Sequence, residues 1–358
     1  MIPRLFAQAS RCASSMCRTQ RARLGEMIKT VERLDISGID STIATSHKPQ
    51  AHVTVLVVTF NRRILLMRCL AAIAGQTRPP ERILIVDNAS TDGTRDFLQS
   101  EGWLQRQNVE LLALDDNTGG AGGFSAGLKH AVENGADWVW MMDDDAEPQP
   151  DALEKLTDRS LTPENLYGSV AVFCDRLSWP MMPHNGKSKD SIAYVHAFEK
   201  LPYELDVQFI PFLGILVNTA LVKRIGLPDA GFFLAADDVD YCMRAREAGA
   251  KILLVGASRI THPASERYRL QLPGRPFYLL KLAPWKRYYD VRNRIFVARR
   301  HYGAALWYKT IPSSFLRLMV TLWHEDKRYQ QIKAFCAGMI DGLWERKGKR
   351  HEKWGIRP

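Results

Sequence analysis

Residues 138–145 read Trp-Val-Trp-Met-Met-Asp-Asp-Asp, an apolar run that ends in three consecutive carboxylates. Burial of apolar side chains gives no reason to collect three like charges, so the pattern indicates a positive group nearby. Because alternate residues of a strand share a face, Asp143 and Asp145 can approach one cation from the carboxyl end of the strand. Carboxylate oxygens suit Mg²⁺ and Mn²⁺ as ligands. An acidic turn before the loop breakers Pro148 and Pro150 is the alternative that this stretch leaves open.

The stretches before this run alternate between strand and helix patterns. Continuous apolar or β-branched runs predict strands over residues 53–59, 82–86, 109–114 and 138–142. Helical patterns lie between them, over residues 61–74, after residue 92 and over residues 125–134. Such alternation predicts an α/β fold with a Rossmann-like, mainly parallel sheet flanked by helices.

A polar cluster follows each of the predicted strands. In parallel sheets, ligands bind at the carboxyl ends of the strands, so the four clusters are expected to face one crevice. Each cluster alone could be only a turn or a helix cap. The clusters are Thr59-Phe60-Asn61, Asp87-Asn88-Ala89-Ser90, Asp115-Asp116-Asn117 and Asp143-Asp144-Asp145.

A glycine-rich segment follows the third strand. Residues 117–123 read Asn-Thr-Gly-Gly-Ala-Gly-Gly and lead into a helical pattern. Glycines let a backbone approach a ligand closely, and a helix N-terminus favours an anion. The spacing matches neither the dinucleotide fingerprint nor a P-loop, so a sugar nucleotide held by the sheet edge and a metal ion is the better expectation.

Composition and cysteine usage limit the class of protein. The 358 residues, 46% hydrophobic and 25% charged, allow a packed core in one large or two ordinary domains. No stretch reaches the roughly 18 uncharged apolar residues that a spanning helix needs. Six cysteines without metal-type spacing fit a reducing compartment, so the cytoplasm is expected. Residues 1–50 are expected to form a flexible N-terminal extension, with a targeting peptide as the alternative.

The C-terminal part of the chain is strongly basic. Residues 257–358 hold 22 Lys and Arg against 7 Asp and Glu, whereas residues 1–256 hold 27 against 32. Aromatic and basic side chains are interleaved, as in Trp285-Lys286-Arg287-Tyr288-Tyr289. This composition is typical of a segment on an anionic membrane surface, and a helical subdomain with a solvated basic face is the alternative. Nucleic acid is not expected as a partner, because no DNA- or RNA-binding module accompanies the basic residues.

Four motifs in a fixed order carry a resemblance to a known family. Over about residues 53–265 the chain resembles the inverting family 2 glycosyltransferases, which have the GT-A fold. Within that family it is most similar to bacterial galactofuranosyltransferases, and it is similar also to relatives that transfer rhamnose. The motifs are Val-Val-Thr-Phe-Asn-Arg (57–62), Val-Asp-Asn-Ala-Ser-Thr-Asp-Gly-Thr (86–94), Asn-Thr-Gly-Gly-Ala-Gly-Gly-Phe (117–124) and Asp-Asp-Asp (143–145).

The resemblance implies a domain organisation. Residues 51–265 would form the GT-A domain, with the nucleotide sugar in its first half (51–150) and the acceptor in its second half (151–265). Residues 266–358 would be a helical region that associates with a membrane. Two C-terminal segments, residues 288–294 and 338–343, also recur in bacterial members that act on polyprenol-linked acceptors.

The resemblance also implies a role for particular residues. Asp238 would be the base that activates the acceptor hydroxyl, with Asp237 contacting or orienting the acceptor; acids that merely complement a helix dipole are the alternative. The metal on the diphosphate, Mn²⁺ or Mg²⁺, would be held by Asp143, Asp145 and His262. Residues expected to bind the donor are Thr59, Asn61, Asp87, Asn117, Gly119, Gly120, Asp143 and Asp144. Residues expected to bind the acceptor are Trp179, Phe212, Gly214 and Asp237.

The expected activity is therefore transfer of galactofuranose from UDP-galactofuranose to a polyprenol-linked glycan, in the synthesis of a cell-envelope polysaccharide. Transfer of rhamnose from dTDP-rhamnose is the enzymatic alternative, and a non-catalytic glycan- or nucleotide-binding module is a more distant one. The expected location is the inner face of the cytoplasmic membrane, where the protein would be peripherally bound. Whether the chain forms a homo-oligomer is left open.

Overall fold

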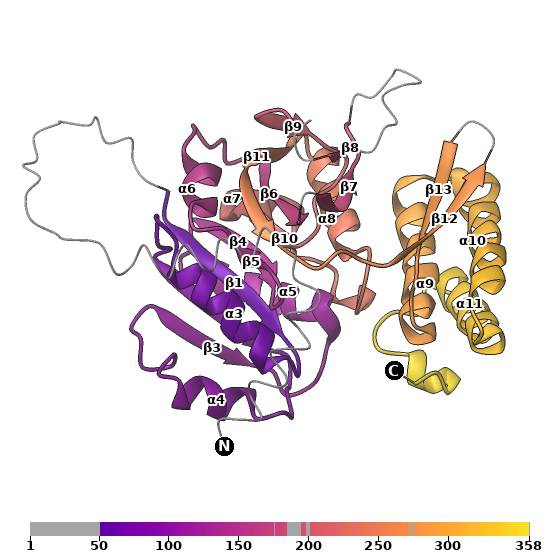
Figure 1. The fold of residues 1–358 in the computed structure, drawn as a ribbon, viewed down its shortest axis with the longest axis horizontal. Coiled ribbons are helices and arrows are strands. Elements are labelled where there is room, and N and C mark those ends of the chain that lie inside the picture. Colours follow the sequence, from indigo (N-terminus) through magenta and orange to yellow (C-terminus); the bar gives the residue numbers. More distant parts are fainter. Residues whose placement is uncertain (1–50, 175, 185–194, 198–200, 273–274, 358) are drawn as a thin grey trace, which may run out of the picture. The chain divides into compact units, whose positions relative to one another are not determined.

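The structure, a computed structural model, describes residues 51–174, 176–184, 195–197, 201–272 and 275–357 (Figure 1). The flexible extension predicted for residues 1–50 lies outside these residues. The described residues of 51–173 and 177–357 form one compact unit.

A mixed sheet forms the centre of this unit, and eleven strands contribute to it among the described residues. Its main path runs β3-β2-β1-β4-β10-β6-β11-β5, while β7, β8 and β9 pair at its margins. The strands are β1 (Val53–Thr59), β2 (Arg82–Asp87), β3 (Val109–Ala113), β4 (Trp138–Asp143), β5 (Glu147–Pro148), β6 (Leu166–Phe173), β7 (Arg176–Met181), β8 (Val195–Ala197), β9 (Glu204–Asp206), β10 (Leu213–Asn218) and β11 (Ile252–Thr261).

The first four strands are parallel, as the sequence predicts. β1 is buried along its whole length, and β4 is buried up to Asp143, which is the pattern of strands covered on both faces. In the register of β1, Thr59 pairs with Asp87 of β2, and Val58 pairs with Asp143 of β4. The polar residues that end these strands therefore meet at one edge of the sheet.

Strand β10 runs opposite to the strands on either side of it. It is antiparallel to both β4 and β6, and β11 is parallel to β6, so β6 and β11 run in the direction of β4. The pairing of β10 with β4 is irregular around Gly214, whose φ is +93°. A Cβ atom at Gly214 would lie 2.3 Å from the Ile260 side chain, so glycine is required there.

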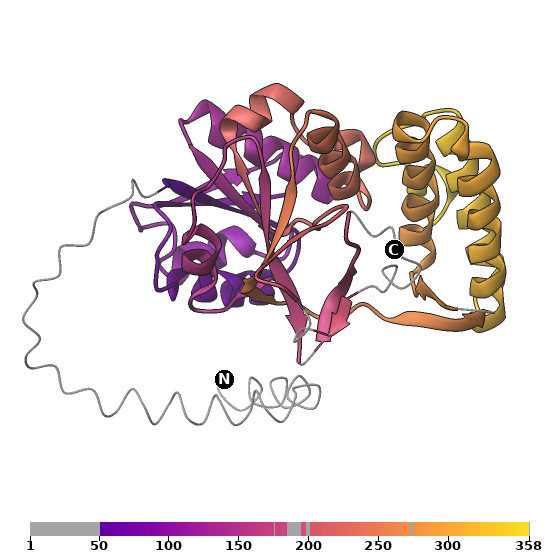
Figure 2. The same ribbon diagram turned by 90° about the horizontal axis from the view of Figure 1, so that it is seen from above.

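Helices cover both faces of the sheet (Figures 1 and 2). Apolar side chains of α3, α4 and α6 pack on one face, and those of α5, α7 and α8 pack on the other. The helices are α3 (Arg63–Ala74), α4 (Thr94–Ser100), α5 (Gly119–Glu133), α6 (Ala152–Thr157), α7 (Thr219–Ile225) and α8 (Asp237–Glu247), with a 3₁₀ turn η2 (Ala230–Phe232) before α8.

Helix α5 begins six residues earlier than predicted, at Gly119 rather than Ser125. Glycine is a poor helix former, by about 1 kcal/mol relative to alanine, and this preference suggested a loop. The glycines instead allow close packing: a Cβ atom at Gly123 would lie 2.5 Å from Val58, and one at Gly127 would lie 2.4 Å from Leu56. Tertiary packing against β1 therefore overrides local propensity.

The C-terminal region is helical, as predicted. Figures 1 and 2 show α9, α10 and α11 side by side, with the hairpin of β12 and β13 against them. A Cβ atom at Gly338 of α11 would lie 2.5 Å from the Tyr288 carbonyl oxygen of α9, so this glycine permits the close contact of the two helices. The elements are β12 (Arg267–Leu272), β13 (Arg275–Leu280), α9 (Pro284–His301), η3 (Leu306–Thr310), α10 (Ile311–His324), α11 (Arg328–Leu343) and η4 (His351–Trp354).

Among the described residues, no helix has both the length and the apolar character that crossing a membrane requires.

Candidate active site

The three acids at the end of β4 lie in a dense polar cluster. Thr59 Oγ1 donates a hydrogen bond to Asp144 Oδ2 at 2.8 Å. The Arg62 guanidinium lies between two carboxylates, 3.3 Å from Asp144 Oδ1 and 3.0 Å from Asp145 Oδ2. On the other side, His262 Nε2 lies 3.3 Å from Asp145 Oδ1. The structure therefore brings Thr59 and His262, which are about 200 positions apart, to the same acids. The sequence predicted a site role for each of these residues except Arg62.

The electrostatic environment differs among the three acids. Burial and the charges of Asp145, Asp144 and Asp237 raise the pKa of Asp143 well above its ordinary range. Burial also raises the pKa of Asp144, to about 6, although Arg62 and Thr59 oppose the shift. The pKa of Asp145 is lowered, because its contacts with His262 and Arg62 outweigh the effect of burial. A site with an excess of buried negative charge is suited to bind a cation.

The second acid pair opens helix α8. Burial and the neighbouring Asp238 raise the pKa of Asp237 to about 8. Burial raises the pKa of Asp238 to about 6, although the Val239 backbone N–H, 2.8 Å from Asp238 Oδ1, favours the charged form. The charge of Asp237 also acts on Asp143, so the acid pair of α8 and the three acids after β4 share one electrostatic environment. That these residues hold a donor and activate an acceptor stays a prediction.

The loops after β1 and β2 are tied to each other. Asn61, which is exposed and has a φ of +54°, accepts a hydrogen bond from the Thr91 backbone N–H at 2.6 Å. Asp87 Oδ1 accepts one from the Ser90 backbone N–H at 2.9 Å. Both predicted donor residues therefore shape the loops at the sheet edge.

Asn88 was not among the predicted site residues, although it lies in a motif. Its side chain joins the loop after β2 to the start of α5: Nδ2 donates to the Gly119 carbonyl at 2.9 Å, and Oδ1 accepts from the Thr118 N–H at 2.9 Å. Asn117 Oδ1 in turn accepts from the Gly119 N–H at 2.9 Å. Asn117 and Gly119 are thus held by protein contacts, whereas a Cβ atom at Gly120 would meet none of the described atoms within 4 Å.

Three residues predicted to bind the acceptor lie in or beside the core. Phe212 packs between Phe124 and Tyr241, with its ring centroid 4.8 and 5.8 Å from theirs. Trp179 is partly buried and packs against the apolar side chains of both faces of the sheet, and the Arg267 guanidinium lies over its ring. Gly214 lies at the irregular pairing of β10. The structure brings Asp237 to the site but adds no support for an acceptor role of the other three, which stays a prediction.

The chemical types of the acidic cluster fit a divalent cation. His262 Nδ1 is buried without a hydrogen-bond partner among the described residues, which is costly unless another group binds there, and Asp145 Oδ1 is buried beside His262 Nε2. Carboxylate and imidazole are suitable ligands for a first-row divalent ion. As they stand, no three His, Cys, Asp or Glu side chains of the described part converge closely enough to hold an ion. The predicted ligand set therefore stays a prediction.

Two positive residues of the site were also not predicted. Arg62 is the last residue of the motif at residues 57–62, and Lys286 is one of the basic residues of the C-terminal region. Burial and the charge of Arg62 lower the pKa of Lys286, while Asp145 and Asp143 act against this shift. The start of α9 therefore brings a cation into the field of the acidic cluster.

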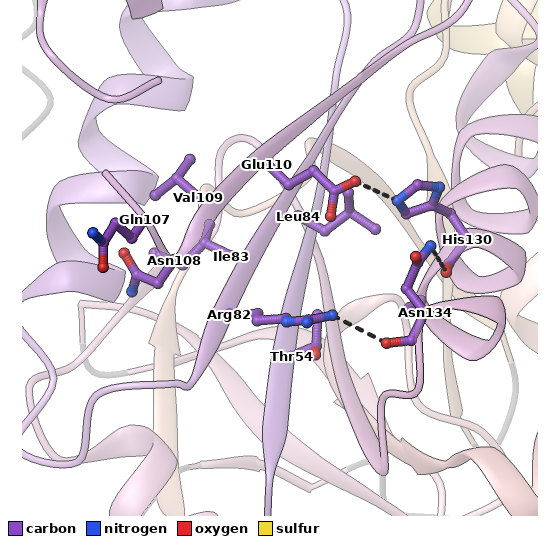
Figure 3. A pocket seen from close by; sticks show the side chains of 11 residues that line it. Thr54, Arg82, Ile83, Leu84, Gln107, Asn108, Val109, Glu110, His130 and Asn134 are labelled. Atoms are coloured by element: carbon purple, nitrogen blue, oxygen red, sulfur yellow. Dashed lines mark hydrogen bonds and ion pairs between the residues drawn. The ribbon is translucent and has the colours of Figure 1, made fainter. Parts of the chain in front are cut away.

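One cavity of about 320 Å³ lies elsewhere (Figure 3). It is lined by the first residues of β1 and β2, including Thr54 and Arg82, and therefore lies at the opposite strand ends from Thr59 and Asp87. The hydrogen bond between His130 and Glu110 at 2.6 Å spans part of it. None of the predicted site residues lines this cavity.

Comparisons with known proteins find a matching family model and similar sequences. A family model described as glycosyl transferase family 2 matches residues 54–212. The galactofuranosyltransferase GlfT1 of Mycobacterium tuberculosis is 30% identical over 259 residues, covering 68% of this chain and 81% of that protein. The dTDP-rhamnosyl transferase RfbF of Shigella flexneri is 21% identical over 299 residues, covering 82% of this chain and 96% of that protein.

Solved structures share the fold. A mannosyltransferase from Pyrobaculum calidifontis, in complex with GDP-mannose and Mn²⁺, superposes with a TM-score of 0.52 at 15% identity. The match covers 83% of this chain and 88% of that one.

Proposed function

Since the chain belongs to glycosyl transferase family 2 and has the GT-A fold, we propose that this glycosyltransferase moves galactofuranose from UDP-galactofuranose to a polyprenol-linked glycan. The observation that carries the proposal is the shared electrostatic environment of the three acids at the end of β4 and the acid pair at the start of α8. Displacement at a sugar carbon needs both a site for the diphosphate and a base for the acceptor, and these two groups of acids can supply them.

Asp238 is the base in this proposal. Its carboxylate takes the proton from the acceptor hydroxyl while the hydroxyl oxygen attacks the anomeric carbon. The bond from that carbon to the diphosphate oxygen breaks, its electron pair leaves with UDP, and the configuration at the carbon inverts. A pKa of about 6 leaves Asp238 ionised at neutral pH and close to the range in which a general base is most effective.

Asp143, Asp145 and His262 would hold a divalent cation at the diphosphate. Such an ion, when bound, stabilises the negative charge that develops on the leaving group. Support comes from the buried His262 Nδ1, which has no hydrogen-bond partner among the described residues, and from the Mn²⁺ in the similar mannosyltransferase structure. Arg62 and Lys286 add positive charge near the same position.

The choice of sugar rests on the relatives. The mycobacterial galactofuranosyltransferase is the more similar in sequence, which favours galactofuranose. The Shigella dTDP-rhamnosyl transferase matches over nearly its whole length, which makes rhamnose from dTDP-rhamnose the second candidate.

A membrane surface is the proposed place of action. Large apolar side chains are exposed on η3, on α10 and at the start of α11. Lys309 of η3, Lys327 just before α11 and Arg328 of α11 are exposed beside them in the sequence. Aromatic and basic side chains together favour binding to an anionic bilayer, and on the cytoplasmic face such binding would bring the site to a lipid-linked acceptor. The exposed apolar residues are Trp307, Tyr308, Phe315, Leu316, Met319, Trp323, Tyr329 and Ile332.

The test is donor turnover by the purified protein. UDP-galactofuranose, UDP-galactopyranose, UDP-glucose and dTDP-rhamnose are each supplied with Mn²⁺ or Mg²⁺ and a bacterial membrane lipid extract as acceptor source. We expect a labelled lipid product from UDP-galactofuranose, and its loss when EDTA removes the metal. If dTDP-rhamnose is the donor that gives a product and UDP-galactofuranose gives none, the transferred sugar is rhamnose. Equal turnover with and without EDTA would refute the metal role.

A further inference from the structure

The loop that leads into α8 has an unusual backbone. Phe233, Ala235 and Ala236 have φ values of +62°, +67° and +63°, although none of them is glycine. Each such residue costs on the order of 1–3 kcal/mol and persists only where its surroundings enforce it. Ala236 is the N-cap residue of α8 and provides no side-chain cap, so the position of Asp237 and Asp238 depends on what holds this loop.

One side chain of the C-terminal region contacts three carbonyl groups of the loop. Asn293 Nδ2, from α9, lies 3.0, 2.7 and 2.8 Å from the carbonyl oxygens of Phe232, Leu234 and Ala235, which share its two N–H donors. The Asn293 side chain is completely buried. Three converging carbonyl groups define where the loop lies, and therefore where the first turn of α8 begins.

Arg292 fixes the orientation of Asn293. Its Nε donates to Asn293 Oδ1 at 2.9 Å, which directs the amide nitrogen towards the loop. Its Nη2 donates to the Phe232 carbonyl at 2.7 Å, and its Nη1 donates to the Gly348 carbonyl at 2.6 Å. Like Asn293, Arg292 has no exposed surface, so the hydrogen bonds of both side chains are made within the protein.

The loop also contacts the donor side of the site. The Ala121 backbone N–H donates to the Phe233 carbonyl at 3.2 Å, and a Cβ atom at Gly119 would lie 1.9 Å from that oxygen. The start of α5 thus packs directly on the loop that Asn293 holds. One piece of backbone connects the glycine-rich segment, the acid pair and the C-terminal helices.

We propose that Asn293, oriented by Arg292, is a positioning residue for transfer: by holding residues 232–235 from α9, it places Asp238 against the acceptor hydroxyl. This inference rests on the proposed function of Asp238 as the base. In this view the C-terminal region is part of the catalytic unit as well as a candidate membrane contact. A small displacement of a base is costly, since about 1 Å of misplacement can lower a rate about 100-fold.

The test compares Asn293→Ala with Gln331→Ala. The control variant also loses a buried side-chain amide of the C-terminal region, whose Nε2 donates to the Leu282 carbonyl at 2.9 Å, away from the loop before α8. We expect Asn293→Ala to lower kcat at least tenfold with the KM for the donor within twofold of wild type, and Gln331→Ala to keep kcat. Thermal melts of both variants measure the stability that each loses. If the loss of kcat in Asn293→Ala merely follows the fraction unfolded, the inference is wrong.

A double variant separates positioning from a general structural role. In Asp238→Asn the base is absent, so the further change Asn293→Ala should leave the residual rate unchanged. A double variant that loses rate by the full factor of Asn293→Ala would refute the inference. If Asn293→Ala does not fold, Asn293→Ser, which keeps one donor, is measured by the same criteria.

Failure of the proposed function can be distinguished from failure of the inference about Asn293. Any donor that the wild-type protein turns over serves for these assays, whatever its sugar. If the wild-type protein turns over none, the proposed function fails, and hydrogen exchange of the amides of residues 233–236 decides the inference. Faster exchange in Asn293→Ala than in Gln331→Ala supports the role of Asn293 in holding the loop, and equal exchange overturns it.

Discussion

At the start of α8, two neighbouring carboxylates have different environments. Asp237 is buried with a pKa of about 8, whereas Asp238 is partly accessible with a pKa of about 6. At neutral pH the pair therefore carries one proton, mainly on Asp237. Such a separation of pKa values is what assigns different tasks to two adjacent acids, and it favours Asp238 as the base.

Replacing the base is the first prediction. Asp238→Asn should lower kcat by about 10²- to 10⁴-fold, because a positioned general base contributes about that factor. Donor binding should be retained, since the side chain acts on the acceptor. Product formation and calorimetric titration of UDP measure the two effects. Glu247→Gln, at the far end of the same helix, is the matched control, and a Glu247→Gln loss as large as that of Asp238→Asn would contradict the assignment.

The protonation of Asp237 predicts a dependence of stability on pH. A carboxyl whose pKa is raised to about 8 in the folded state, from about 3.9 when unfolded, binds its proton more tightly when folded. Its contribution to the free energy of unfolding therefore falls as pH rises from about 4 to 8. Asp237→Asn removes this loss, so in metal-free protein at pH 8.5 it should melt about 2–4 °C higher, for a gain of about 1 kcal/mol. At pH 5 the melting temperatures of the variant and the wild type should differ little. A difference in melting temperature that narrows with rising pH would disprove the raised pKa of Asp237.

The metal ligands can be tested by binding alone. Asp145→Ala should abolish the part of UDP binding that depends on Mn²⁺, and His262→Ala should weaken Mn²⁺ affinity at least tenfold, because each change removes a ligand. Titration calorimetry with and without EDTA measures both. Glu147→Gln lies two residues from Asp145, where its carboxylate pairs with Arg68, and should leave binding unchanged. Metal-dependent binding in Asp145→Ala equal to wild type would exclude this residue as a ligand.

At the scale of elements, the glycines of α5 have distinct tasks. Gly127 lies where the helix crosses β1 and β2, and a Cβ atom there would lie 2.4 Å from Leu56 and 2.7 Å from Val86. Gly120 faces open space at the end of the same helix that meets the strand termini. Gly127 is therefore required by packing, whereas the space beside Gly120 is open.

Alanine at these two positions should have opposite effects. Gly127→Ala should lower the free energy of unfolding by about 1–3 kcal/mol, the usual cost of overpacking a core. Gly120→Ala should be neutral or stabilising by up to about 1 kcal/mol, because alanine is the better helix former. Chemical denaturation measures both. If Gly120→Ala keeps its stability but binds UDP more weakly, the backbone there approaches the donor; unchanged UDP binding would contradict its assignment as a donor residue.

At the scale of the whole molecule, the C-terminal region contributes to both proposed tasks. Its α9 supplies Lys286 to the acidic cluster and Asn293 to the loop before α8. Its α10 exposes Phe315, Met319 and Trp323 to 50%, 68% and 83%, at a spacing of four residues that places them on one helical face. Catalytic support and the candidate membrane contact thus come from neighbouring helices of one region.

The exposed face of α10 predicts binding to anionic lipid. Vesicles that contain phosphatidylglycerol should sediment the protein at low salt, and the bound fraction should fall as salt screens the basic residues. Changing Phe315, Met319 and Trp323 to Ser should weaken binding at least tenfold, because burying each side chain contributes about 1.5–3 kcal/mol. Tyr203→Ser removes an exposed aromatic ring outside this region and is the control. Equal binding of the triple variant and wild type would rule out this face.

Local sequence pattern was sufficient for the first half of the fold and for most of the acids of the site. Continuous apolar runs bounded by polar residues mark β1, β2 and β4, because strands buried on both faces must be apolar along their length. The carboxyl ends of such strands lie at one edge of the sheet. The sequence pattern alone therefore predicts that Asp87 and the acids at 143–145 lie close together. The pair Asp237 and Asp238 depended on resemblance to a family, since local pattern alone could not distinguish it from a helix start.

Tertiary structure decided what depends on contacts between distant residues. The early start of α5, the reversed direction of β10 and the burial of Phe212 follow from how side chains fill space, and a short window of sequence does not contain their partners. The same holds for Arg62 beside Asp144, Lys286 near the acidic cluster, and Asn293 on the loop before α8. Their residue types resemble those of ordinary surface positions, and only the packing of α9 and the strand ends turns them into parts of one site.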